Sequence, residues 1–156
     1  MIKKLISFLV VLLVLLEYVL LIDVSTKEEK PIPSKKEMAI YSVCKDEYLT
    51  TVFANSKYPY LLTAIAKVES DYKPQIRGDH GKSFGLYQIQ SRYWGVVPDS
   101  VEGQTRHAER IIGCLIKQHG LTKAVERYNG SGRGSRRYRQ KVFLVMKQLK
   151  EIERTA

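Results

Sequence analysis

The strongest constraint on the fold is an apolar run over residues 59–70, which has the spacing of a buried helix. Pro59 suits the first turn of this helix, and the polar residues and proline of 71–74 end it. Its expected buried side consists of Leu61, Leu62, Ile65 and Val68. Glu69 lies in the last turn, so a carboxyl group is held at the end of a buried helix. That position makes Glu69 a candidate acid, although most glutamates near helix ends are solvated.

The rest of the domain is also helical in pattern. The predicted helices span residues 37–55, 59–70, 104–119, 122–128 and 135–152. We expect the first of them to bury Met38, Tyr41, Cys44 and Tyr48. Gly120 is expected to stop the third helix, and Ser135 is expected to cap the last. Residues 84–89 predict a short extended stretch or hairpin. The predicted fold class is therefore mainly α with a small β element.

The first 22 residues have the composition of a membrane-targeting segment. Two lysines precede residues 5–22, which are apolar except for Ser7 and Glu17 and approach the ~20 residues of a membrane span. The positive-inside rule then places the remaining chain on the extracytoplasmic side. Because no small-x-small cleavage site follows, we expect a retained anchor; the alternative is a cleaved signal peptide and a secreted protein. Residues 23–36 predict a linker, and residues 37–156 predict one domain.

The charge of the chain narrows its partners. A formal net charge of +10, all of it beyond residue 23, predicts affinity for polyanions or anionic surfaces. Nucleic acid, phospholipid head groups and acidic wall polymers all satisfy that condition. Five of the cations gather within residues 133–141, and a run of this kind is most often a solvated face.

The cysteines and histidines show no metal-binding pattern. Cys44 and Cys114 form no CxxC motif, so we expect either one disulfide in an oxidising compartment or two separate thiols. His80, His107 and His119 share no spacing and are expected at the surface. The expectation is therefore no metal and no cofactor.

Two polar motifs downstream strengthen the candidacy of Glu69. They are the glycine-framed segment 84–89 and the cluster 128–131. Glycoside cleavage needs a carboxylic acid that stays protonated near neutral pH, and burial of Glu69 would raise its pKa toward that range. Glycine lets backbone approach a ligand closely, while Tyr87 and Gln88 offer a ring and an amide to a sugar. Ordinary core packing is the alternative for Tyr87 and for Tyr138.

The three motifs Val68-Glu69-Ser70, Gly85-Leu86-Tyr87-Gln88-Ile89 and Tyr128-Asn129-Gly130-Ser131 resemble those of the soluble lytic transglycosylases, which have a lysozyme-like fold. The resemblance covers about residues 58–142. It implies cleavage of the β-1,4 bond between N-acetylmuramic acid and N-acetylglucosamine in peptidoglycan, with Glu69 as acid and then base. The expected products carry 1,6-anhydro ends.

The same resemblance implies a role for each motif residue. Ser70 would orient Glu69. The glycan groove and the sugar at the cleaved bond would be contacted by Gly85, Leu86, Tyr87, Gln88, Tyr128 and Asn129. Tyr138 resembles the downstream tyrosine of the family.

The loop over residues 78–86 is also similar to that of goose-type lysozymes, in which an aspartate here positions a hydrolytic water. Asp79 stands at this place. The second aspartate of those enzymes is absent, because Gln90 replaces it. We therefore expect the lyase outcome, with a hydrolytic muramidase as the alternative and a turn-forming role as the simplest interpretation of Asp79.

Two further functions compete with catalysis. A degenerate member of the fold would bind glycan strands without cutting them, and the run at 133–141 would suit nucleic acid. An extracytoplasmic domain disfavours nucleic acid, so the expected partners are peptidoglycan strands and the membrane. Wall remodelling, a secretion or conjugation machine, and phage entry with a virion-associated enzyme all fit this reading.

Overall fold

The structure is a computed structural model of the 156-residue chain. It describes residues 12–13, 15–16, 31–130 and 132–156. The chain divides into two units, Met1–Ile32 and Pro33–Ala156. Apart from four helical positions, the anchor predicted at residues 1–22 lies outside the described residues. Among the residues that are described, no helix has the length and apolar character that a bilayer crossing requires.

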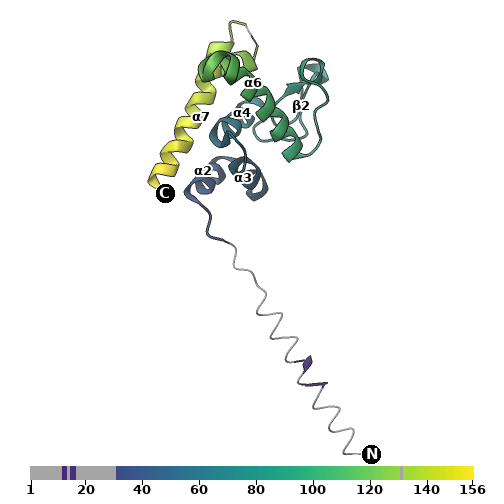
Figure 1. The fold of residues 1–156 in the computed structure, drawn as a ribbon, viewed down its shortest axis with the longest axis vertical. Coiled ribbons are helices and arrows are strands. Elements are labelled where there is room, and N and C mark those ends of the chain that lie inside the picture. Colours follow the sequence, from purple (N-terminus) through teal and green to yellow (C-terminus); the bar gives the residue numbers. More distant parts are fainter. Residues whose placement is uncertain (1–11, 14, 17–30, 131) are drawn as a thin grey trace, which may run out of the picture. The chain divides into compact units, whose positions relative to one another are not determined.

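Helices dominate the second unit (Figure 1), and a small antiparallel sheet accompanies them. The helices are α2 (Lys35–Cys44), α3 (Glu47–Ala54), α4 (Pro59–Ser70), α5 (Ser91–Trp94), α6 (Val101–Tyr128) and α7 (Ser135–Thr155). The strands are β1 (Arg77–Gly78), β2 (Ser83–Phe84) and β3 (Ile89–Gln90), with a 3₁₀ turn at Asp79–Gly81. The predicted fold class, mainly α with a small β element, is confirmed.

The central helix is α4, which contacts α2, α3, α6 and α7 (Figure 1). Pro59 occupies its first turn, and every residue from Leu61 to Ala66 is buried. The helix ends where Asp71 adopts a left-handed conformation with φ 51°. This is the helix that the apolar run predicted, with the same limits.

The single helix predicted over residues 37–55 is wrong, because the chain breaks it into α2 and α3. Lys45 adopts a left-handed conformation, and the Asp46 carboxylate then accepts a hydrogen bond from the backbone N–H of Leu49 as an N-cap. The break also changes the buried face. Met38, Tyr41 and Tyr48 are exposed, and the core receives Ala39, Ile40, Leu49 and Phe53 instead.

The C-terminal half of the domain consists of α6 and α7. Ser100 caps α6, and Gly120 interrupts it with φ 73° and ψ 162°, which is the stop that the sequence predicted. Ser135 is the first residue of α7 and does not cap it; Gly134 occupies the cap position without a side-chain hydrogen bond. The buried face of α7 carries Tyr138, Val142 and Leu149.

A buried glutamine holds the segment between the second and third strands. Gln104 of α6 accepts a hydrogen bond from the N–H of Leu86 at 2.7 Å and donates to the carbonyls of Pro74 and Asp99. Gly85 passes this side chain with φ +79°, and a Cβ there would lie 2.3 Å from Gln104 Oε1. Only glycine meets both conditions without displacing the amide.

Gly85→Ala should therefore lower the free energy of unfolding by about 2 kcal/mol, because it combines a strained φ with a clash against Gln104. Chemical denaturation followed by circular dichroism measures the change. Gly132→Ala is the matched control, since nothing lies within 4 Å of a Cβ at that position. Equal stability of the two variants would contradict this account of Gly85.

Candidate active site

A cleft of about 610 Å³ opens beside the end of α4. Elements far apart in the sequence contribute to it: the last turn of α4, the sheet with its 3₁₀ turn, α5 and the end of α6. The side chains that matter most here are Glu69, Asp79, Gln88, Trp94, Tyr128 and Asn129. The structure thus brings the three sequence motifs to one place.

Glu69 is half-buried and is bound by a side chain from α7. The hydroxyl of Tyr138 donates a hydrogen bond to Glu69 Oε1 at 2.7 Å. Burial raises the pKa of Glu69 to about 7; the Tyr138 hydrogen bond opposes this rise, and the negative charge of Asp79 adds to it. A substantial fraction of the Glu69 carboxyl groups is therefore protonated at neutral pH, as a general acid requires.

Asp79 lines the same cleft, but its surroundings favour the charged form of its carboxyl group. Its Oδ2 accepts hydrogen bonds from the Ser83 hydroxyl at 2.7 Å and from the Gln90 amide at 3.0 Å. These two bonds lower the pKa of Asp79 below its ordinary value. The cleft therefore holds two carboxyl groups whose environments drive their pKa values apart, an arrangement that often separates an acid from a charged partner.

The hydroxyl of Ser70 binds backbone carbonyls. Its buried hydroxyl lies within hydrogen-bonding distance of the carbonyls of Ala66, at 3.0 Å, and Leu86, at 2.9 Å. It joins the last turn of α4 to the segment that follows β2. Ser70 therefore fixes the backbone at the end of α4, which carries Glu69, against the second motif.

The motif at residues 85–89 lies partly in the core and partly at the wall of the cleft. Leu86 and Tyr87 are fully buried, and the Tyr87 hydroxyl lies 3.1 Å from Thr105 Oγ1. Gln88 and Ile89 are the residues of this motif that line the cleft. The Gln88 amide nitrogen donates to the carbonyls of Gly85 and Ile76. Core packing, the alternative named for Tyr87, is what the structure gives.

The third motif reaches the cleft at the end of α6. Tyr128 and Asn129 both line it, and the Tyr128 hydroxyl donates to the carbonyl of Tyr87 at 3.0 Å. Ser131, the last residue of this motif, lies outside the described residues. Tyr128 therefore connects the second motif to the third, just as Ser70 connects the first to the second.

Two aromatic residues of the cleft were not predicted from the sequence. Trp94, the one tryptophan of the chain, and Tyr93 line the cleft with exposed fractions of 41% and 67%. Exposed aromatic rings in a cleft are suited to stacking on a sugar. His107 is buried, contrary to the predicted surface position, and its Nε2 lies 2.9 Å from the Trp94 carbonyl oxygen.

In the described part of the chain, no group of three or more His, Cys, Asp or Glu residues is arranged to hold a metal ion. Cys44 and Cys114 are free thiols, so the disulfide considered from the sequence is not formed.

Comparisons of the chain with protein-family models, with curated proteins and with solved structures found no match. The chemistry of the cleft must therefore be inferred from its own residues.

The raised pKa of Glu69 makes a prediction about stability. Below about pH 4.5 the carboxyl is protonated in both the folded and the unfolded chain; between there and pH 7 only the folded chain keeps the proton. Stability that is present at low pH is thus lost as pH rises. Glu69→Gln removes this loss. The free energy of unfolding of the variant, relative to that of the wild type, should therefore rise by about 3 kcal/mol from pH 4 to pH 8.

Urea denaturation at a series of pH values measures that difference. Glu151→Gln is a suitable control, because Glu151 is an exposed carboxylate paired with Arg154. A stability difference for Glu69→Gln that stays constant with pH would show that Glu69 is not desolvated.

Proposed function

We propose that the chain is a peptidoglycan lytic transglycosylase with a lysozyme-like fold and Glu69 as its catalytic acid and base. The observation that carries the proposal is the state of Glu69, a half-buried carboxyl with a pKa of about 7 in a cleft that also presents exposed aromatic rings. Few other reactions need a neutral carboxylic acid beside a platform for sugars. The order of the three motifs supports the same family.

In the proposed reaction, Glu69 first donates its proton to the oxygen that bridges the two sugars. The bond between that oxygen and the anomeric carbon of the muramyl residue breaks, which frees a hydroxyl on the leaving sugar. The 6-hydroxyl of the same muramyl residue then bonds to its anomeric carbon. Glu69, now a carboxylate, accepts the proton of that hydroxyl, so no water is consumed and the acid is restored.

Neighbouring side chains would assist these steps. The Tyr138 hydroxyl holds Glu69 Oε1 in place and stabilises the carboxylate that forms after proton donation. Trp94 and Tyr93 offer stacking surfaces, while Gln88 and Asn129 line the same cleft with amide groups suited to acetamido and hydroxyl groups. Ser70 and Gln104 act through the backbone that carries these residues.

Glu69→Gln should reduce the release of soluble fragments from purified sacculi by at least about 100-fold, since an amide cannot donate the proton. Mass spectrometry of the wild-type products should show 1,6-anhydro ends. Glu151→Gln, an exposed substitution near the end of α7, should keep full activity. Full activity in Glu69→Gln would overturn the assignment of Glu69.

A hydrolytic muramidase is the second candidate, and the setting of Asp79 favours it. This carboxylate lines the cleft with a lowered pKa and is oriented by Ser83 and Gln90. It could hold a water molecule for attack on the anomeric carbon. Gln90 occupies the place of the second aspartate of goose-type lysozymes and donates a hydrogen bond to Asp79. Asp79 would then be the one carboxylate that positions the water.

Asp79→Asn separates the two reactions. For the lyase we expect anhydro ends to persist, while the alkaline limit of activity moves to lower pH, because loss of the Asp79 charge lowers the pKa of Glu69. A drop of about 100-fold together with loss of reducing ends would instead assign Asp79 to hydrolysis. Asp71→Asn is the control, since Asp71 is exposed and paired with Lys67 outside the cleft.

The proposed setting follows from the N-terminal segment. Two lysines followed by an apolar stretch support a membrane anchor with the enzyme on the extracytoplasmic side, where peptidoglycan lies. A binder without activity would retain sacculi and release nothing from them, so the same digestion assay distinguishes it from an enzyme.

A further inference from the structure

Two smaller cavities adjoin the cleft at the loop between α6 and α7. The first, called the junction cavity, has a volume of about 540 Å³ and shares Arg127 and Gly130 with the cleft. The second, called the side cavity, measures about 250 Å³ and shares Glu69 and Asn129 with the cleft. Both cavities are therefore neighbours of the cleft, and the side cavity meets it at the candidate acid.

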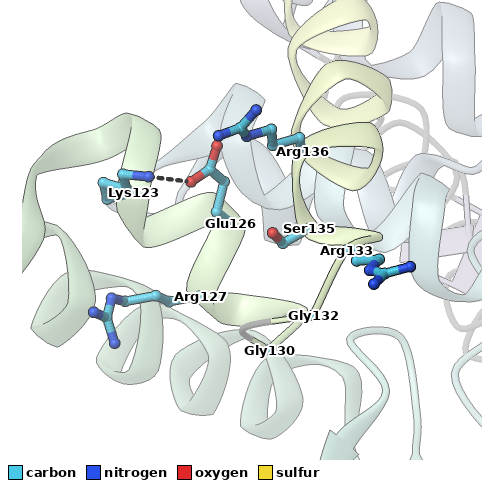
Figure 2. Close-up of a pocket in the computed structure, with 8 residues that line it drawn as sticks. All are labelled: Lys123, Glu126, Arg127, Gly130, Gly132, Arg133, Ser135 and Arg136. Carbon is cyan, nitrogen blue, oxygen red and sulfur yellow. Dashed lines mark hydrogen bonds and ion pairs between the residues drawn. The ribbon is translucent and has the colours of Figure 1, made fainter.

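In the junction cavity, some of the cationic side chains are already close to a carboxylate. Figure 2 shows Lys123 and Arg136 directed toward Glu126, while Arg127 and Arg133 point away from it in different directions. Glu126 binds Lys123 at 2.8 Å and also Arg139 at 2.6 Å. This cluster ties α6 to α7, so it has a structural explanation that needs no ligand.

The cations that line the side cavity have no such structural role. Arg137 and Lys141, one turn apart on α7, line it together with Glu69 and Tyr138. Within the described residues, neither cation has a hydrogen bond or an ion pair with a carboxylate. Like charges at this spacing destabilise a helix on their own. Glu69, the one carboxyl group among the residues that line this cavity, is engaged by Tyr138 and cannot neutralise two cations.

We propose that Arg137 and Lys141 bind an acidic substituent of the glycan strand next to the cleaved bond. The inference rests on the proposed function, because it requires a glycan strand in the cleft. An unsubstituted neutral strand would give these cations nothing to bind. A strand with acidic side branches would extend one branch from the cleft into the side cavity, where it meets both charges.

The chemistry of the pair limits what the substituent is. A guanidinium can hold a carboxylate or a phosphate through two parallel hydrogen bonds, and an ammonium adds a point charge. Two sources on a wall strand carry such groups: the carboxylates of a peptide stem and the phosphodiesters of an attached polymer. Both present the same anionic group to Arg137 and Lys141.

The test compares initial rates of fragment release by the full chain from three sacculus preparations. These are intact walls, walls stripped of peptides by an amidase, and walls freed of phosphodiester-linked polymers by hydrofluoric acid. The wild type should cleave intact walls about fivefold faster than one of the stripped preparations. The slower preparation identifies the substituent as carboxylate or phosphate.

The double variant Arg137→Gln/Lys141→Gln should reduce this ratio to about one. Lys147→Gln/Lys150→Gln removes the same charge from the exposed, distal part of α7 and should keep the wild-type ratio. Circular dichroism checks that both variants fold. The proposal is overturned if both double variants lose the ratio, since general attraction to the wall would then explain it.

The remaining outcomes separate this inference from the proposed function. Equal wild-type rates on all three preparations would overturn the inference and leave the enzyme assignment intact. No release from any preparation would overturn the proposed function, and the inference with it. If Arg137→Gln/Lys141→Gln kept the ratio but lost retention on double-stranded DNA, the two cations would belong to a nucleic-acid surface and the inference would be wrong.

Discussion

The burial of α4 on several sides is the constraint on which the rest of the structure depends. Residues 61–66 are all buried, so α2, α3, α6 and α7 must pack around this helix. Its last turn then emerges at the edge of the core with Glu69 half-buried and next to Tyr138. The raised pKa of Glu69 is a consequence of this packing, because a carboxylate at that edge loses part of its hydration. The candidate chemistry of the cleft is thus produced by the same contacts that hold the fold together.

How far the sequence predicts the structure depends on the kind of signal. The limits of α4 follow from an apolar run between proline and polar residues, and these local signals match the tertiary packing. The split between α2 and α3 was missed because helical spacing continues across Lys45 and Asp46. One left-handed residue and one capping aspartate break the helix, and they rotate the buried face away from Met38 and Tyr41. The buried His107 has its hydrogen-bond partner in α5, at Trp94, which lies 13 residues earlier in the chain.

The candidate site was also predicted only in part from the sequence. Glu69, Gln88, Tyr128 and Asn129 were expected in one groove, and they line one cleft. Ser70, Leu86 and Tyr87 belong to the same motifs but lie in the core, where Ser70 and Tyr87 form hydrogen bonds that hold the cleft-lining residues. A motif read from sequence does not separate residues that touch a ligand from residues that hold the loop. Trp94 lay outside every motif, and its rarity in the chain was the one signal available.

The basic run at 133–141 shows why composition alone is a weak guide to function. Four of its five cations lie on α7, and the 3.6-residue period gives them different neighbours. Arg139 faces the end of α6 and binds the buried Glu126, which joins two helices. Arg137 and Lys141 lie on either side of Tyr138 in the sequence, and Tyr138 packs inward to bind Glu69, so both cations reach the cavity that Glu69 lines. Arg137 and Lys141 are exposed, and they line the same cavity as the candidate acid. In the proposed enzyme, the same part of α7 would bind the acidic group of the substrate and hold Glu69 in place through Tyr138.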